Sequence, residues 1–401
     1  LTDTDGAYAL PPFQGFCDAV GIRALHGAEL HDPQGEDRRG DDRKRRDRAV
    51  VLVKDATGHR SLCHLLTRRH LDERFTLDDD LAELGAGLVV LTPSPRLLAA
   101  LHPAFDADDL YGEIVAHAPV TARRAIQERA HALERPVVGT FRTFFTRPKE
   151  HTLHRLQLAI GHLKRLRDVV PGAVGRDGRP LDLAPPEACL VPPAAAAKAF
   201  ADVPEAALNT VRIAERLTFR LERSARPRLP SLDLTEEDSA YGRLAKRCVE
   251  GLERRYGQLR PDVLARLERE LRVIRDRGFC DYFLIVHGLV GFAKEQSIPV
   301  VGRGSAANSI VAYALGITSV DPLRYDLPFE RFLSPARKDC PDIDLDIDWR
   351  GRDAVIQHAY DVYGEDRVAM ISTHVTVQAR GAVREAAKTF GMPPPEIDRV
   401  A

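Results

Sequence analysis

The segment Pro341-Asp342-Ile343-Asp344-Leu345-Asp346-Ile347-Asp348 alternates acidic and apolar residues after its proline. Successive side chains of a β-strand point to opposite faces, so a strand here would place all four aspartates on one face. Neighbouring carboxylates on that face would lie about 7 Å apart and, at an effective dielectric of roughly 20, repel each other by about 2 kcal/mol. A bound divalent cation relieves such repulsion. The segment therefore predicts a strand that holds magnesium ions through oxygen ligands.

The chemistry that this strand favours is nucleotidyl transfer. Two magnesium ions about 4 Å apart can activate a 3′-hydroxyl and stabilise a pyrophosphate leaving group. An EF-hand calcium loop does not fit, because it requires glycine where Ile347 stands and lacks the alternating apolar residues. A solvated edge strand, whose negative charges prevent pairing with other sheets, remains an open alternative for this segment by itself.

A glycine-rich turn precedes the carboxylates in the sequence. Ile298–Val301 is predicted to be a short apolar strand, followed by Gly302-Arg303-Gly304-Ser305 and a helix over residues 306–315. The glycines allow close backbone approach, Ser305 can cap the helix, and a helix N-terminus attracts anions. A phosphate-binding turn and a plain strand–turn–helix connection fit equally well. A dinucleotide fingerprint fits less well, because its expected acid, Asp321, precedes Pro322 in a turn.

Three cations lie between this turn and the carboxylates, namely Arg331, Arg337 and Lys338. They can clamp a triphosphate whose metal ions sit on the aspartates. Each could instead form a surface ion pair, for example with Glu330 or Asp339. The order of strand, Gly-Ser turn, helix, basic segment and acidic strand is typical of a nucleotidyltransferase palm, and it is more specific than any single part.

The overall composition is that of an ordinary globular protein. A length of 401 residues predicts two or three domains, with 44% hydrophobic and 29% charged residues. A formal net charge of -1 argues against a wholly basic nucleic-acid binder. The six cysteines form no C-x-x-C pair, so reduced thiols are expected. The absence of a long apolar run and of a leader pattern predicts a cytoplasmic protein without membrane contact.

Residues 1–150 are expected to form one α/β unit. A helix is predicted at Phe13–Ala19, and extended segments are predicted at Ile22–Leu30, Ala49–Lys54, Gly87–Leu91 and Pro136–Gly139. Their alternation with helical patterns indicates a mainly parallel or barrel-like arrangement. The highly charged stretch 31–48 is expected to be a solvated loop.

Proline-rich and glycine-rich stretches at 174–197 and 226–232 are predicted to connect modules, with a helix at Ala206–Leu221 between them. A capping box formed by Thr235 and Asp238 is expected to open the next helix. Two apolar stripes at helical spacing are expected to face the core, one with Leu244, Cys248 and Leu252 and, after Pro261, one with Leu264, Leu267, Leu271 and Ile274.

The three palm segments resemble those of the bacterial C-family DNA polymerases, the DNA polymerase III alpha subunits. The matching stretches are Val301–Ser309, Phe329–Pro335 and Pro341–Asp346. The resemblance implies that Asp342 and Asp344 bind two Mg²⁺ ions. It also implies that Gly304 and Ser305 form a nucleotide motif and that Arg331 and Arg337 bind the triphosphate. Asn308 resembles the error-prone members of the family.

The first 150 residues resemble the polymerase-and-histidinol-phosphatase (PHP) domain of the same family, a distorted β/α barrel. Asp3, Thr4, Glu29, Arg142 and Phe144 stand at its metal motifs, but Thr4, Arg142 and Phe144 replace metal-binding residues. Arginine and phenylalanine cannot bind a hard divalent cation. The resemblance therefore implies a degenerate PHP metal site that is not an active nuclease.

The expected fold is α/β, with a PHP-like domain at 1–150, a connecting segment at 151–225, the first part of an α+β palm at 226–372 and the start of a thumb at 373–401. The family places a third catalytic aspartate beyond Ala401, so this chain alone is expected to be inactive. Implied partners are primer-template DNA, deoxynucleoside triphosphates and, through other segments, a sliding clamp and further replication proteins. A non-catalytic scaffold and a PHP metallophosphoesterase or 3′–5′ exonuclease are the alternatives.

Overall fold

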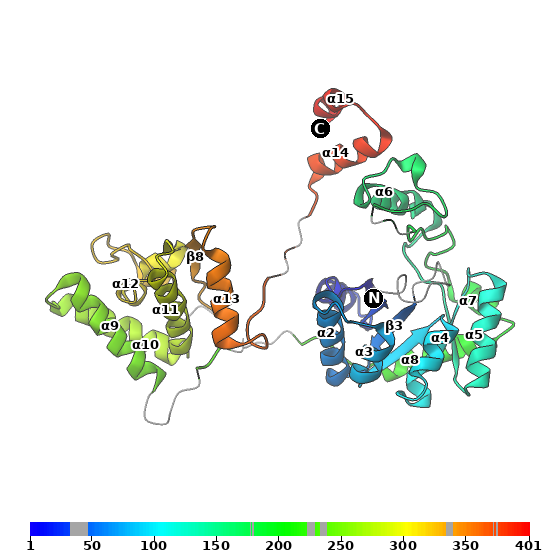
Figure 1. Cartoon of the computed structure of the whole chain (residues 1–401), viewed down its shortest axis with the longest axis horizontal. Helices are drawn as coiled ribbons and strands as arrows, with labels where there is room; N and C mark the ends of the chain where they lie inside the picture. Colours follow the sequence, from blue (N-terminus) through cyan, green and yellow to red (C-terminus); the bar gives the residue numbers. More distant parts are fainter. Residues whose placement is uncertain are drawn as a thin grey trace. The chain divides into compact units, whose positions relative to one another are not determined.

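The computed structural model describes residues 1–32, 47–176, 178, 180–222, 229–232, 239–333, 340–371, 373 and 376–401. It separates the chain into two compact units, drawn in Figure 1. The first unit comprises residues 1–222 and 375–401, and the second comprises residues 223–374. The division into PHP-like, connecting, palm and thumb segments stays a prediction, because two compact units do not test four segment borders.

A mixed six-stranded sheet is the centre of the first unit. Its strands follow chain order, β1 (Thr2–Thr4), β2 (Gly27–His31), β3 (Arg48–Val53), β4 (Leu88–Thr92), β5 (Leu110–Val115) and β6 (Val137–Thr140). β3 pairs antiparallel with β2 and β4, and the other pairings are parallel. The α/β fold class is therefore confirmed. Within the described residues no pairing joins β1 to β6, so the sheet is open.

Most of the predicted strands of this unit are confirmed. The extended segments at 49–54, 87–91 and 136–139 correspond to β3, β4 and β6. The segment Ile22–Leu30 was predicted too long, since only Gly27–His31 pairs in the sheet. The predicted loop at 31–48 lies largely outside the described residues, but His31 and Arg48 at its ends belong to strands and pair with each other.

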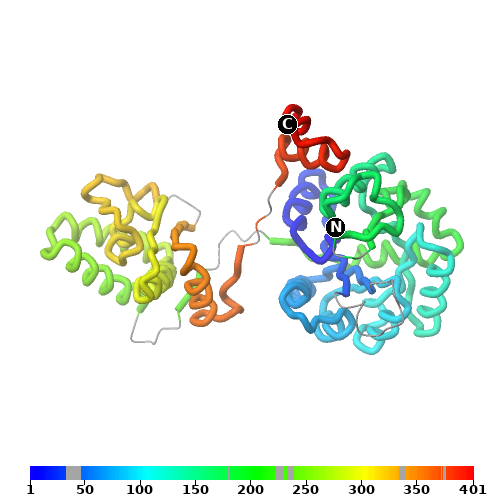
Figure 2. Tube along the Cα trace, turned by 45° about the horizontal axis from the view of Figure 1, so that its top comes forward, coloured from blue at the N-terminus to red at the C-terminus, as the bar shows by residue number. Residues whose placement is uncertain are grey.

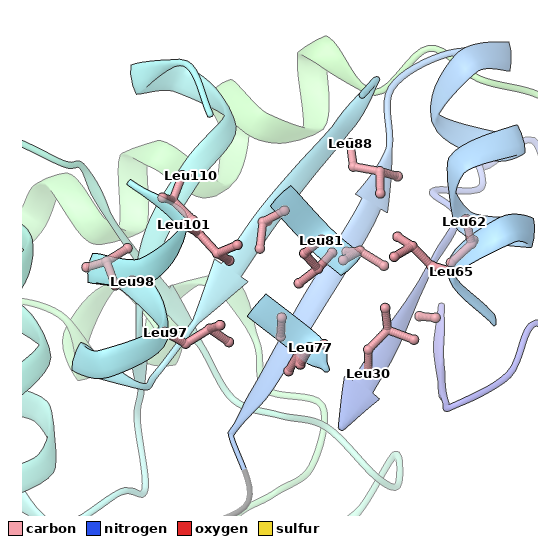
Figure 3. Packing of buried hydrophobic residues seen from close by; sticks show 14 of the residues in the cluster. Leu30, Leu62, Leu65, Leu77, Leu81, Leu88, Leu97, Leu98, Leu101 and Leu110 are labelled. Carbon is pink, nitrogen blue, oxygen red and sulfur yellow. The ribbon is translucent and has the colours of Figure 1, made fainter. Parts of the chain in front are cut away.

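Helices cover this sheet, and many of their leucines are buried against it. They are α1 (Leu10–Ala19), α2 (Ala56–Leu71), α3 (Leu77–Leu84), α4 (Pro95–Leu101), α5 (Val120–Ala132) and α8 (Pro204–Arg216), with the 3₁₀ turn η1 (Ala107–Asp109). Figure 3 shows Leu62 and Leu65 of α2 packed with Leu77 and Leu81 of α3. All four side chains are fully buried, so this cluster is the core that fixes α2 and α3 on the sheet.

Smaller elements complete the first unit. They are η2 (Pro148–Glu150), α6 (His151–Gly161), η3 (Leu166–Asp168), α7 (Pro193–Ala199), α14 (Ala379–Phe390) and α15 (Pro394–Val400). α14 packs beside α6, as Figures 1 and 2 show. In the described part of the chain no helix is both long and apolar enough to cross a membrane.

The second unit is mainly helical around a two-stranded ribbon. Its elements are α9 (Ala240–Tyr256), α10 (Pro261–Asp276), α11 (Cys280–Glu295), β7 (Val300–Arg303), η4 (Gly304–Asn308), α12 (Ile310–Ala314), η5 (Phe329–Arg331), β8 (Asp344–Ile347) and α13 (Arg352–Tyr363). One apolar cluster joins α9, α10, α11 and α12. This cluster supports the ribbon from one side, because Ile343 and Leu345 pack against it.

Two expectations for these helices need comment. The capping box of Thr235 and Asp238 lies outside the described residues, and α9 is capped instead by Ser239, whose hydroxyl accepts a hydrogen bond from the Gly242 amide at 3.0 Å. The assignment of Leu264 to the core of α10 is wrong, since this side chain is 43% exposed. Val263 is buried in its place.

Candidate nucleotide and metal site

The acidic strand pairs with the strand that precedes the glycine turn. In the antiparallel ladder Arg303 lies opposite Asp344, and Val301 lies opposite Asp346. The Arg303 guanidinium lies 3.4 Å from Oδ2 of Asp344, and its Nε donates to Oδ1 of Asp346 at 3.0 Å. One side chain reaches both carboxylates, so the alternation does place Asp344 and Asp346 on one face.

The strand itself is shorter than predicted. The prediction covered Pro341–Asp348, whereas β8 comprises Asp344–Ile347. The physical reason lies in the partner strand: β7 ends at Arg303, and Gly304 then turns the backbone away with a φ of +71°. Asp342 consequently lacks a ladder partner in β7 and lies just before the strand.

Tyr282 of α11 fixes the backbone between the two candidate metal ligands. Its hydroxyl oxygen accepts a hydrogen bond from the amide of Ile343 at 3.1 Å. Burial raises the pKa of Tyr282, and the negative charges of Asp342 and Asp344 add to the rise. Neither Tyr282 nor Arg303 was assigned to the site from the sequence, because their contacts with Ile343, Asp344 and Asp346 join segments far apart in the chain and leave no local pattern.

Gly304 brings the backbone of the turn close to the acidic strand. A β-carbon built at this position would lie 3.4 Å from Oδ2 of Asp344, and the positive φ disfavours any other residue. Gly304 is exposed and Ser305 is half-buried, so the start of the turn is open to solvent beside the carboxylates.

The predicted capping role of Ser305 is wrong. The turn continues as the 3₁₀ segment η4, which delays the start of α12 to Ile310. Ser309 is the residue that caps α12, with its hydroxyl accepting from the Ala312 amide at 3.2 Å. Among the described residues the Ser305 hydroxyl has no hydrogen-bond partner, so it is available to an external group.

Of the two candidate triphosphate arginines, the structure describes one. Arg331 is exposed at the end of η5, and within the described residues it forms no ion pair. The alternative pairing of Arg331 with Glu330 is not formed, since Glu330 lies 3.5 Å from Arg269. Arg337 lies outside the described residues, as do Lys338 and Asp339.

The acidic strand offers oxygen ligands and excess negative charge. Asp344 and Asp346 are 42% and 61% exposed, and Asp342 is exposed. Among the described residues Arg303 is the cation that contacts Asp344 and Asp346. Exposed carboxylates with free oxygens fit a hard cation such as Mg²⁺. Among the described residues, however, no three potential ligands gather at one point. A magnesium site here would need water, substrate or a ligand from elsewhere.

The second predicted metal site is occupied by arginines. Arg142 binds Glu29 through two hydrogen bonds of 2.6 and 3.1 Å, and it binds Asp182 through two more of 2.8 and 2.7 Å. Arg48 lies 3.0 Å from Glu29 and 2.7 Å from Glu113. Burial by itself would raise the pKa of Glu29, but the hydrogen bond from Arg142 and the charge of Arg48 lower it.

The neighbouring acid Asp5 is held in the same way. Arg69 lies 2.9 Å from Oδ2 of Asp5, and its Nε donates to the His31 carbonyl at 2.8 Å. The imidazole of His31 lies between the carboxylates of Glu29 and Asp5, with Nε2 3.3 Å from the first and Nδ1 3.8 Å from the second. Three guanidinium groups thus pair with the four carboxylates of this cluster, Asp5, Glu29, Glu113 and Asp182.

Asp3, Thr4 and Phe144 complete the set of residues predicted for this site. Asp3 accepts a hydrogen bond from the Ala9 amide at 2.9 Å, Thr4 is exposed on β1, and Phe144 packs against the ring of His154 at 5.1 Å. With Arg142 on Glu29 and phenylalanine beside it, this donor set does not fit a divalent cation. Arg48, Glu113 and Asp182 were missed by the sequence analysis, because they meet Glu29 only through the fold.

Comparison with known proteins places the whole chain among polymerase relatives. Residues 242–401 match the family described as the bacterial DNA polymerase III alpha NTPase domain. The DNA polymerase III subunit alpha of Escherichia coli K12 is 34% identical, covering 100% of this chain and 36% of that protein.

Two further relatives agree with this match. The corresponding subunit of Treponema pallidum (strain Nichols) is 33% identical over 99% of the chain, which covers 36% of that protein. An error-prone DNA polymerase of Mycolicibacterium paratuberculosis is 34% identical over 98% of the chain and 37% of that protein. The chain therefore spans little more than a third of the length of the curated relatives it matches.

Proposed function

The chain belongs to the family of bacterial DNA polymerase III alpha subunits and error-prone DNA polymerases, and on that basis we propose that it is part of a DNA-directed DNA polymerase. In the complete protein it would help to add deoxynucleotides to a primer 3′ end by two-metal nucleotidyl transfer. The observation that carries the proposal is the position of the Gly304 backbone beside Asp344, because a phosphate-binding turn and metal ligands must adjoin for this reaction.

We assign the metal ligands to Asp342 and Asp344. They would hold two Mg²⁺ ions together with a third aspartate from another part of the protein. When bound, these ions would activate the primer hydroxyl and stabilise the departing pyrophosphate. The protein's own contribution is to hold Asp344 on the ribbon and Asp342 directly before it. The backbone bond from Ile343 to Tyr282 and the β7–β8 ladder support that role.

Gly304, Ser305, Arg331 and Arg337 are proposed to bind the triphosphate. The free hydroxyl of Ser305 can donate to a phosphate oxygen, and Gly304 is exposed beside it. Arg331 supplies an exposed positive charge from η5, which packs beside η4. Guanidinium groups bind phosphate oxygens through paired hydrogen bonds, so arginines are well suited to hold a triphosphate.

The PHP-like domain is proposed to be inactive as a nuclease, because arginines occupy its carboxylates. The polymerase activity is proposed for the complete protein and not for these 401 residues alone. Its substrates would be primer-template DNA and deoxynucleoside triphosphates. A sliding clamp and other replication proteins would bind through other segments.

The test is primer extension by the complete protein carrying Asp344→Asn. The amide keeps the size of the side chain but loses the charge that a metal requires, so extension should fall by at least about a thousandfold. Asp353→Asn is the matched control, because Asp353 is 82% exposed on α13 and pairs with Arg352. Near-normal extension by the Asp344 variant would remove the assignment of the metal site.

A further inference from the structure

The helix α10 carries one charged side chain on its buried face. Glu270 lies between the core residues Leu267 and Leu271, and its side chain is 0% exposed. A buried carboxylate is costly unless it is paired and hydrogen-bonded. Its partners therefore show what it holds in place.

Glu270 holds the start of α12. Its Oε2 accepts a hydrogen bond from the Ser309 hydroxyl at 2.8 Å and from the Val311 amide at 3.4 Å. The same Ser309 hydroxyl caps α12 by accepting from Ala312. Ser309 is fully buried, so solvent cannot replace the carboxylate as its partner.

Arg266, one turn earlier on α10, ties two further segments together. Its Nε donates to Oε1 of Glu270 at 2.5 Å. One terminal nitrogen donates to the carbonyl of Asn308 at 3.0 Å and to that of Leu327 at 2.9 Å. The Asn308 side chain in turn donates to the carbonyl of Ser305 at 2.8 Å.

Apart from each other, the side chains of this pair find their hydrogen-bond partners, among the described residues, in two segments. Asn308, Ser309 and Val311 follow directly on the Gly304–Ser305 turn, and Leu327 precedes η5, which ends at Arg331. Both segments carry residues proposed above to bind the triphosphate. An apolar pair at 266 and 270 could fill the same space but could bind neither carbonyl.

We propose that the buried Arg266–Glu270 pair is a positioning element that fixes the Gly304–Ser305 turn and Arg331 relative to each other for triphosphate binding. Arg266 and Glu270 do not touch the nucleotide. They act by fixing the distance between the segment that follows the Gly304–Ser305 turn and the segment that precedes η5. The part of this inference that concerns the nucleotide rests on the proposed function, whereas the tie between the two segments does not.

The tie is tested by amide hydrogen exchange on the 401-residue chain. Glu270→Gln should raise exchange at residues 309–312 and 327–331 by about tenfold, because it leaves Arg266 unpaired. Glu268→Gln is the control: Glu268 lies on the same helix, is 70% exposed and pairs with Arg272. Arg266→Lys keeps the charge but cannot reach Glu270, the Asn308 carbonyl and the Leu327 carbonyl together, so it should raise exchange most at residues 327–331. This second variant tests the tie even if Glu270→Gln does not fold. Exchange unchanged in both segments would overturn the tie.

The consequence for the nucleotide is tested by single-nucleotide incorporation with the complete protein. Glu270→Gln should raise KM for the incoming nucleotide by about tenfold while KM for the primer-template stays within about twofold. An equal rise in both KM values, or a fall in kcat with both KM values unchanged, would overturn the positioning role. If the unmodified protein incorporates nothing, the proposed function fails, and the exchange measurement alone then decides the tie.

Discussion

Arg142 lies against Glu29, with two hydrogen bonds of 2.6 and 3.1 Å across 113 residues of sequence. The same guanidinium binds Asp182, so the segment that carries Asp182 is joined through Arg142 to Glu29 on β2. Removing one member of a buried charge pair leaves the other unpaired, and this costs about 3–5 kcal/mol when burial is complete.

Arg142→Met should therefore destabilise the first unit. Arg142 is 20% exposed, so we expect a loss of about 2–3 kcal/mol in the free energy of unfolding, measured by urea titration. Arg147→Met is the matched control, because Arg147 is exposed a few residues later. An equal, small effect of both substitutions would show that the arginine network contributes little.

The same network predicts how stability depends on pH. Burial would raise the pKa of both Glu29 and Asp182, but hydrogen bonds from Arg142 outweigh it, so both values are lowered in the folded chain. Their stabilising contribution is thus complete above the ordinary values of about 4.3 and 3.9 and is lost as the pH falls through the lowered ones. In urea titrations between about pH 3 and 6, the difference between the unmodified chain and Arg142→Met should grow with pH. A constant difference would contradict this assignment.

Gly304→Ala should reduce primer extension by more than its loss of stability explains. The substitution places a β-carbon 3.4 Å from Asp344 at a φ of +71°, so it should cost about 1 kcal/mol of stability and reduce primer extension by the complete protein. Gly257→Ala is the control, since Gly257 has a φ of +72° and nothing within 4 Å of the added carbon. Both variants should lose similar stability, but extension should fall only for Gly304→Ala.

Arg303→Gln should strengthen cation binding at the acidic strand. Arg303 is 60% exposed and contacts both Asp344 and Asp346, so its removal leaves their repulsion uncompensated. Because exposed ion pairs are weak, terbium affinity measured by luminescence should rise by no more than about fivefold. Arg352→Gln, which removes a similarly exposed arginine from Asp353, should leave it unchanged. Weaker binding after Arg303→Gln would mean that the arginine orders the carboxylates for the cation.

Features set by local sequence were predictable. The alternation around Asp344 predicted a shared face with Asp346, and the β-branched runs located β3, β4 and β6. The cap of α12 was misassigned to Ser305, because Ser305 and Ser309 both fit the cap rule. Ser305 lies inside η4, and α12 begins four residues later than expected, directly after Ser309.

Contacts that depend on the fold were not predictable from single positions. Asp182 reaches Glu29 through Arg142, and Tyr282 reaches Ile343 across 61 residues. Glu270 did leave a signal, since a charged residue interrupts an otherwise apolar helical stripe. The sequence shows that such a residue needs a partner, but it does not show which one.

The β7–β8 ribbon has one further consequence. A two-stranded ribbon is marginal by itself, and among the described residues the outer edge of β8 has no strand partner. A third strand added there would bring a residue opposite Asp344, with the two β-carbons about 5 Å apart. Backbone register, and not a flexible side chain, would then set how near a further carboxylate comes to this aspartate.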